Sequence, residues 1–184
     1  MQRVLILPLT LAAALTGAAA LAAGPVFAAE KTIDIHSITA SGVGSKIGTI
    51  AAKDTPQGLM LSPALANLQP PGPHGFHLHE KPDCGPGPGP NGQPAAGMGA
   101  GGHYDPRRTG RHHGPHDRMG HMGDLPPLVV NGDGTATLPV IAPRLKVKDL
   151  SGHALMIHAG GDNYSDEPTP LGGGGGRIAC GVIR

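Results

Sequence analysis

The chain has 184 residues, which suits a single domain, and it contains 31 glycines, 20 prolines and 11 histidines but only 2% aromatic residues. So much glycine and proline is typical of a loop-rich or disordered chain with a thin core. Charged residues make up 15% and the formal net charge is +1, which excludes a strongly basic nucleic-acid-binding protein and an acidic solvating tail.

The N-terminal segment has the features of a secretory signal peptide. Arg3 precedes an apolar run over 4–15, and an alanine-rich stretch leads to Val26 and Ala28, small residues at the −3 and −1 positions of a cleavage site. We expect cleavage after Ala28 or Ala29, so that 1–28 is removed and 29–184 forms one domain free of the membrane. An uncleaved anchor is the alternative, because the apolar stretch is about long enough to span a bilayer.

Two cysteines, Cys84 and Cys180, lie in the exported part. In an oxidising compartment, two cysteines in a small domain most simply form a disulfide. On the chain-entropy model, closing a loop of this size stabilises the fold by about 4–5 kcal/mol. A metal site is the alternative, although neither cysteine has another cysteine at ligand spacing.

After the signal, short stretches of alternating or apolar residues are separated by turns. They predict eight strands, at 31–40, 46–53, 58–65, 74–80, 128–131, 135–141, 154–159 and 177–183. The Asn-Gly-Asp-Gly sequence at 131–134 predicts a hairpin between the fifth and sixth of these strands. Without helical periodicity, this pattern predicts an all-β sandwich or barrel.

Two long segments do not fit strands. Residues 81–127 are dense in Gly, Pro and His, and 160–176 end in five glycines. Loops this long in a small domain are usually functional or disordered. The Gly/Pro-rich part at 85–102 can be a flexible linker, whereas the histidines from His103 onward indicate function.

Ten of the eleven histidines lie between His74 and His158. In a strand, His77 and His79 project from the same face, and His158 at the end of another strand can complete a three-imidazole site. His103, His112, His121 and Asp124 follow one another within one loop. Three imidazoles and a carboxylate form a closed tetrahedral zinc site, which would order a loop that has little apolar material.

Six sequence blocks carry a resemblance to a known family: GPHGFHLHE, GGHYDP, TGRHHGP, GHMGDLP, LMIHAGGDNYSD and GGGGRIACGVI. Together they resemble copper,zinc superoxide dismutase of the bacterial secreted type, over essentially the whole exported chain. The resemblance implies an eight-stranded Greek-key β-barrel with two long functional loops, a periplasmic location, and one copper and one zinc per chain.

The resemblance also implies roles for individual residues. Copper would be held by His77, His79, His103 and His158, and zinc by His103, His112, His121 and Asp124, so that the His103 imidazole bridges the two ions. Asp162 would link His77 to His112, and Arg177 would pair with the superoxide anion. Cys84 and Cys180 match the family disulfide, and His74 matches a structural position.

The implied reaction converts two superoxide anions into oxygen and hydrogen peroxide by Cu(II)/Cu(I) cycling, with Arg177 orienting the anion and His103 handling a proton. A protein that only buffers copper or zinc would need the ligands but not Arg177. A hydrolytic zinc enzyme would need an open position that the zinc set does not offer.

Because the net charge is near zero, attraction of superoxide would have to be local. We call the segment 103–124 the histidine-rich loop. Its four arginines, Arg107, Arg108, Arg111 and Arg118, are candidates for this guidance, and a merely solvated basic loop is the alternative. Monomer and homodimer both stay open, as do the roles of His36, His113, His116 and His153 and of the 85–102 segment.

Overall fold

The computed structural model describes residues 29–184, so the expected signal peptide at 1–28 lies outside the described residues. Strands and loops make up nearly all of this part, with three short 3-10 helices, η1 (Met98–Ala100), η2 (Val147–Asp149) and η3 (Leu171–Gly173). Within 29–184, no helix has both the length and the apolar character needed to cross a membrane. The all-β expectation is therefore confirmed.

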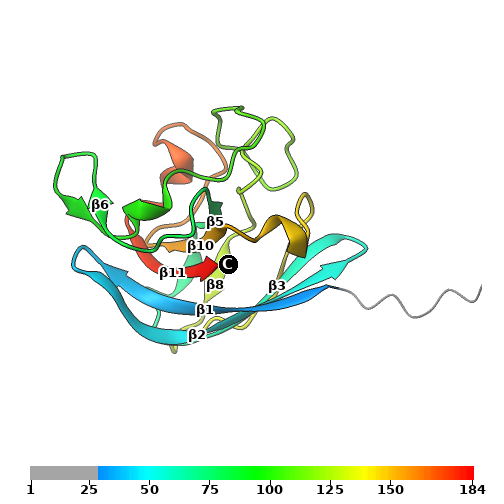
Figure 1. Cartoon of the computed structure of the whole chain (residues 1–184), viewed down its shortest axis with the longest axis horizontal. Coiled ribbons are helices and arrows are strands. Elements are labelled where there is room, and N and C mark those ends of the chain that lie inside the picture. Colours follow the sequence, from blue (N-terminus) through cyan, green and yellow to red (C-terminus); the bar gives the residue numbers. More distant parts are fainter. Residues whose placement is uncertain (1–28) are drawn as a thin grey trace, which may run out of the picture.

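Seven strands form one strongly curled antiparallel sheet, in the order β5-β10-β11-β1-β2-β3-β9 (Figure 1). In chain order they are β1 (Glu30–Thr39), β2 (Gly42–Thr55), β3 (Gly58–Leu65), β5 (Phe76–His79), β9 (Val140–Ala142), β10 (His153–His158) and β11 (Arg177–Ile183). Two small sheets accompany it, β4 (Gly72–His74) with β8 (Leu128–Val130), and β6 (Gly87–Pro88) with β7 (Pro94–Ala95).

The core follows from the alternation of the strands. In β1, Ile33 and Ile35 are buried while the residues on either side of them face outward, as a period-two pattern requires. They join a cluster made almost entirely of aliphatic side chains from both ends of the chain. Phe76 is the single aromatic ring among the buried residues of this cluster in the part of the chain that the structure describes.

A disulfide joins Cys84 to Cys180, as the sequence predicted, across a sequence separation of 96 residues. It ties the segment after β5 to the middle of β11 and packs in a second small cluster with Ile38 and Met156. Ala96 and Ala100 also belong to this cluster, so it joins the 85–102 segment to the main sheet.

One expectation about local structure was wrong. The turn at 131–134 forms, with Asn131 N donating to Thr135 O and Gly134 N to Asn131 O, but it does not join two strands of one hairpin. The strand before it, β8, pairs with β4, while β9 pairs with β3 in the main sheet. The turn therefore carries the chain from one sheet to the other.

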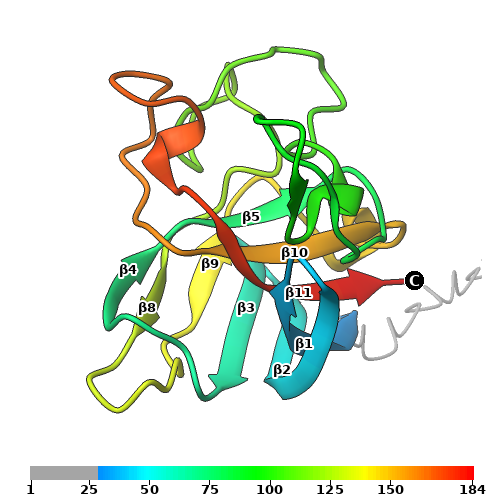
Figure 2. The ribbon, with the colours of Figure 1, turned by 90° about the vertical axis from the view of Figure 1, so that its left-hand side faces the viewer.

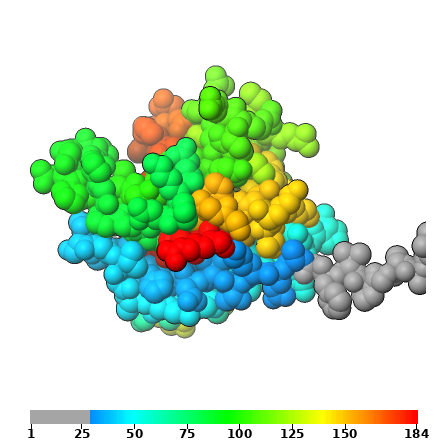
Figure 3. Space-filling model, in the orientation of Figure 1, coloured from blue at the N-terminus to red at the C-terminus, as the bar shows by residue number. Residues whose placement is uncertain are grey.

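The Gly/Pro-rich segment at 85–102, whose role the sequence left open, has regular structure. It forms the β6–β7 hairpin and then η1, and Gly99 N donates to Gly85 O at 3.0 Å to close it. In the space-filling view this hairpin stands out as a lobe at one edge of the molecule (Figure 3). The histidine-rich loop and the segment before β11 lie together above β5 and β10 (Figure 2).

Candidate metal centre

Strand β5 presents two histidines toward the loops. His77 and His79 are fully buried, and β5 pairs on one side with β10, where Met156 faces His77 and Ala154 faces His79. On its other side the histidine-rich loop adds isolated bridges, which pair His77 with Asp124 and His79 with His103. The loop is thus attached directly to the strand that carries the histidines.

Gly123 makes that attachment possible. Leu78 N donates to Gly123 O at 2.9 Å, and a Cβ on Gly123 would lie 2.2 Å from Leu78 O. Only a residue without a side chain can approach the strand so closely, so this glycine sets how near Asp124 comes to β5.

Four imidazoles converge at one point between β5, β10 and the loop. The ligand atoms of His77, His79, His103 and His158 all lie within 4.8 Å of one another. Each ring has one buried nitrogen with no hydrogen-bond partner among the described residues: Nδ1 of His77 and Nε2 of His79, His103 and His158. Buried polar atoms are nearly always paired, so four unpaired ring nitrogens that face one point indicate a metal-binding site.

The second ring nitrogen of each of these histidines has a hydrogen-bond partner. His79 Nδ1 donates to Gly101 O at 3.0 Å, His158 Nδ1 to Gly175 O at 3.2 Å, and His77 Nε2 to Asp162 at 2.8 Å. These bonds place each proton on the outer nitrogen and leave the inner lone pair free. Outer hydrogen bonds of this kind fix the tautomer and orientation of metal-binding imidazoles.

Burial keeps these rings neutral. Desolvation lowers the pKa of His77 and His79 well below the ordinary value, lowers that of His103, and lowers that of His158 to about 4. A neutral imidazole is the form that binds a transition metal, so the site does not have to lose protons at neutral pH. Four nitrogen donors suit copper.

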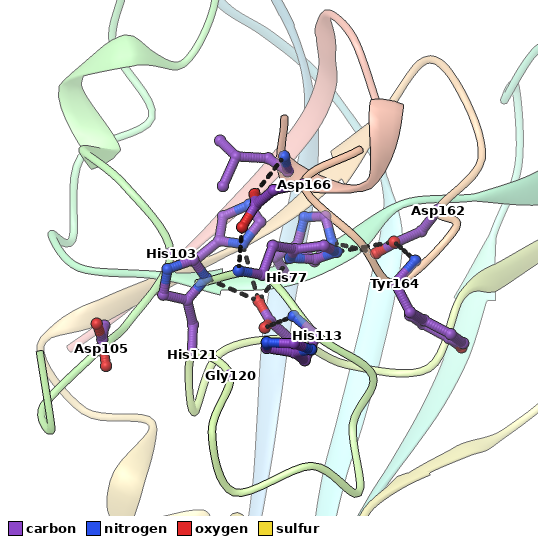
Figure 4. Close-up of polar contacts among 12 residues, drawn as sticks. His77, His103, Asp105, His113, Gly120, His121, Asp162, Tyr164 and Asp166 are labelled. Atoms are coloured by element: carbon purple, nitrogen blue, oxygen red, sulfur yellow. Dashed lines mark hydrogen bonds and ion pairs between the residues drawn. The ribbon is translucent and has the colours of Figure 1, made fainter. Parts of the chain in front are cut away.

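A second group adjoins the first and shares His103. Asp124 Oδ1 lies 2.9 Å from Nδ1 of His103, 3.0 Å from Nδ1 of His112 and 3.2 Å from Nδ1 of His121 (Figure 4). All four residues are buried, and their ligand atoms lie within 4.8 Å of one another. Three imidazole nitrogens and one carboxylate oxygen are a complete donor set for tetrahedral zinc.

The charge state of this group differs from that of the first. Burial lowers the pKa of His112, but hydrogen bonds to Asp124 and Asp162 outweigh it and raise the pKa to about 9. For Asp124, burial raises the pKa, but the bonds from His103, His112 and His121 lower it far below its usual range. The protonated, cationic form of His112 is therefore favoured beside Asp124 and Asp162, and these two carboxylates also favour a bound metal cation.

Asp162 connects the two groups. Its Oδ2 accepts from His77 Nε2 and its Oδ1 from His112 Nε2, both at 2.8 Å (Figure 4). These bonds outweigh burial, which alone raises a carboxyl pKa, and lower the pKa of Asp162. Gly172, at φ +74°, packs against this carboxylate so closely that a Cβ would lie 2.0 Å from Oδ1.

Arg177, the first residue of β11, lies beside the four-imidazole group. Its Nη1 donates to Gly97 O at 2.6 Å and its Nη2 to Gly101 O at 2.7 Å. With His158 it lines a cavity of about 460 Å³, whose remaining walls come from the β6–β7 hairpin, η1 and residues 169–176. Arg177 is the one arginine or lysine lining this cavity, and the arginines of the histidine-rich loop are not among its walls.

The remaining histidines take other positions. His74 is buried, with its ring nitrogens 2.6 Å from His158 O and 2.7 Å from Pro70 O, which is a scaffold role. His113 lies 3.6 Å from Asp117 and His116 is exposed. His153 stacks on Tyr104 with 4.2 Å between ring centroids.

Two polar residues at the site were missed from the sequence. Asp166 accepts from His112 N at 2.9 Å and from Leu171 N at 3.1 Å, and so joins the histidine-rich loop to η3 (Figure 4). Arg144 hydrogen-bonds three carbonyl oxygens of the histidine-rich loop. Neither residue lies near a histidine in the sequence, so no local pattern points to it.

Comparison with known proteins identifies the family of this chain. The sequence model of the family described as copper/zinc superoxide dismutase (SODC) matches residues 46–183. The Cu-Zn superoxide dismutase 1 of Salmonella typhimurium is 53% identical over 154 residues, 83% of this chain and 86% of the relative. The Cu-Zn superoxide dismutase of Escherichia coli K12 is 53% identical over 158 residues, 85% and 90% of the two chains.

Solved structures give the same result. The Cu/Zn superoxide dismutase from Brucella abortus superposes with a TM-score of 0.81 at 46% identity, covering 85% of this chain and all of the other. The monomeric copper, zinc superoxide dismutase from Salmonella enterica gives 0.75 at 54% identity over the same share of this chain. The chain belongs to the copper/zinc superoxide dismutase family, oxidoreductases that use copper and zinc to convert superoxide into molecular oxygen and hydrogen peroxide.

Proposed function

We propose that this superoxide dismutase holds copper with His77, His79, His103 and His158, and zinc with His103, His112, His121 and Asp124. The observation that carries the proposal is the set of four buried imidazole nitrogens that face one another without a partner in 29–184. His103 belongs to both sets, with Nε2 facing the first group and Nδ1 facing Asp124.

When bound, copper supplies the one-electron oxidation and reduction of superoxide. Arg177 attracts and orients the anion, since its guanidinium is a permanent cation with donor hydrogens beside the cavity. Its two bonds to main-chain oxygens hold that cation in place before the anion arrives, so little ordering cost remains at binding.

The chain must also deliver protons to form hydrogen peroxide. We assign this task to Nε2 of His103, which has no partner in the described part of the chain and lies in the four-imidazole group with His77, His79 and His158. Nδ1 stays on the Asp124 side throughout, so the ring keeps its position while Nε2 gains or loses a proton.

Metal analysis with an activity assay tests the proposal. We expect the exported domain to bind one copper and one zinc per chain and to consume superoxide. His79→Gln should lose copper and activity but keep zinc, whereas His121→Gln should lose zinc before it loses copper. As a matched control, His116→Gln changes an exposed histidine of the same loop and should alter neither metal. Retention of copper by His79→Gln would contradict the assignment.

We further propose that the chain is exported to the periplasm and loses residues 1–28 on the way. The Cys84–Cys180 disulfide supports an oxidising compartment. N-terminal sequencing of the protein released from the periplasm should begin at Ala29 or Glu30. A protein that stays in the membrane fraction with Met1 intact would support the uncleaved anchor instead.

We infer a monomer in solution, because the similar Salmonella enterica protein is described as monomeric. Light scattering at increasing concentration measures this directly. Twice the monomer mass would establish the homodimer that the sequence also allowed.

A further inference from the structure

Arg144 is half-buried beneath the histidine-rich loop and bonds only to its main chain. It lies just beyond the end of β9, after Pro143, and its guanidinium donates from Nε to Pro115 O at 2.7 Å, from Nη2 to His121 O at 2.6 Å and from Nη1 to Gly120 O at 3.3 Å. One side chain at the edge of the main sheet thus hydrogen-bonds three carbonyl oxygens of a segment that carries a proposed zinc ligand.

Hydrogen bonds, rather than apolar packing, hold that segment in shape. Between His112 and His121 the large apolar side chain of Met119 is 58% exposed, so packing contributes little. The segment is closed by His121 N donating to Arg111 O at 3.0 Å. It is also tight, because a Cβ on Gly120 would lie 2.7 Å from His113 Cβ and 3.0 Å from Asp124 Oδ2.

Within the proposed zinc set, His121 depends most on outside support. It is the most exposed of the four residues, at 8%, and its ring has the longest contact with Asp124 Oδ1, 3.2 Å. His112 is held through both ring nitrogens and through its main-chain amide. The His121 ring has a single such contact. Its main chain is held by His121 N donating to Arg111 O and by its carbonyl oxygen, which accepts from Asp124 N at 3.2 Å and, at the shorter distance of 2.6 Å, from Arg144 Nη2.

We propose that Arg144 is a positioning residue for zinc, which fixes the main chain at Gly120 and His121 so that the His121 imidazole reaches the ion. The inference rests on the proposed assignment of zinc to His103, His112, His121 and Asp124. Arg144 touches neither metal nor substrate and acts only through the loop. The planar fork of a guanidinium can serve three carbonyl oxygens at once, which a lysine ammonium on a flexible stem cannot do in the same geometry.

Two variants separate this role from a contribution to charge or to stability. Arg144→Lys keeps the charge but loses the fork, and Arg144→Gln loses both. Arg107→Lys is the matched control, because Arg107 also donates to a carbonyl of this loop, Arg118 O at 3.2 Å, but is exposed and does not bond the main chain of a proposed zinc ligand.

The test measures zinc directly. Zinc affinity of each purified protein is determined by competition with a chromophoric chelator, and cobalt(II) in the zinc site reports ligand geometry through its visible absorption. Both Arg144 variants should bind zinc about 10- to 100-fold more weakly than the parent, as is usual for loss of a group that supports a ligand. Their cobalt spectra should shift, and Arg107→Lys should match the parent in both measurements.

Thermal unfolding with and without zinc provides the second readout. A purely structural role would lower the melting temperature of metal-free and zinc-bound protein equally, whereas a positioning role reduces the gain that zinc confers. Parental zinc affinity in Arg144→Lys and Arg144→Gln, or failure of both to fold even with zinc, overturns the inference. If the parent itself gives no tetrahedral cobalt spectrum, the proposed zinc site fails, and the inference falls with it.

Discussion

His79 and Arg177 donate hydrogen bonds to the same carbonyl oxygen, that of Gly101, at 3.0 Å and 2.7 Å. One atom of the main chain therefore sets the position of a proposed copper ligand and of the cation that orients superoxide. A shift of this peptide would move both groups together, which makes Gly101 a sensitive position.

Gly101→Ala should damage the site through the backbone. Gly101 has φ 73° and ψ −152°, a conformation open essentially to glycine, and a Cβ would lie 2.8 Å from Glu80 Oε2. We expect the peptide to rotate and activity to fall by about 10-fold or more, with weaker copper binding. Gly102→Ala is the control, since its added Cβ would approach no closer than 3.9 Å to Glu80. Equal activity in the two variants would contradict the role of the carbonyl.

Arg177→Gln should slow the reaction without removing metal. The anion would lose its one cationic partner on the cavity wall, and loss of a preorganised donor usually costs about 100-fold. Pulse radiolysis measures the rate, and metal analysis should still find copper and zinc. Arg177→Lys keeps the charge, and its rate should lie between those of the parent and of Arg177→Gln. If the glutamine variant is as fast as the parent, Arg177 does not orient superoxide.

Asp162→Asn should weaken metal binding at both groups. Asparagine has one acceptor oxygen where two imidazoles, His77 and His112, now each donate to a carboxylate oxygen at 2.8 Å. One ring must lose its partner, and we expect a loss of metal affinity of about 10- to 100-fold. Asp117→Asn, at an exposed position of the histidine-rich loop, serves as the control. Chelator competition identifies which metal is lost first.

The metal-free protein should lose stability on both sides of neutrality. The pKa of His158 is lowered to about 4, so the unfolded chain binds more protons there and the free energy of unfolding falls as the pH drops from 6.5 towards 4. The pKa of His112 is raised to about 9, so its contribution is present below pH 6.5 and is lost as the pH rises through 9. Urea unfolding of metal-free protein at several pH values measures both slopes.

His158→Gln separates the two slopes, because it should reduce the acid slope, to which His77, His79 and His103 also contribute, and leave the alkaline side unchanged. An acid slope as steep as that of the parent would show that other buried groups account for it.

The rate should fall with ionic strength if the arginines of the histidine-rich loop guide superoxide. Attraction by exposed charges is screened beyond about 10 Å at 0.1 M salt. A variant with glutamine at all four positions, Arg107, Arg108, Arg111 and Arg118, should be slower at low salt and less sensitive to added salt. A rate that is flat with salt in the parent would assign these arginines to a solvated surface, consistent with their absence from the cavity wall.

Much of this centre could be predicted from the sequence, because side chains that bind metals have distinctive chemistry. His77 and His79 on one strand face, and the loop series from His103 to Asp124, indicated ligands, and the structure brings them together. The disulfide followed from two cysteines in an exported domain, and β1 followed from the alternation of Ile33 and Ile35.

What the sequence did not reveal depends on the main chain or on distant pairing. The acceptors for His79, His158 and Arg177 are carbonyl oxygens of glycines, which any residue possesses, so no residue type marks them. The Asn131 turn predicted a hairpin, but partner strands far along the chain decided that β8 and β9 pair elsewhere. Arg144 acts on carbonyls more than twenty residues away, beyond any local motif.

The disulfide also limits motion around the anion-binding side chain. Cys84 begins the segment that supplies the Gly97 and Gly101 carbonyls, and Cys180 lies in the strand that starts at Arg177. The sulfur bridge therefore restricts how far the arginine and its two acceptors can drift apart during thermal fluctuation. In a chain with so little aromatic packing, this disulfide therefore helps to hold Arg177 in its catalytic position and also stabilises the fold.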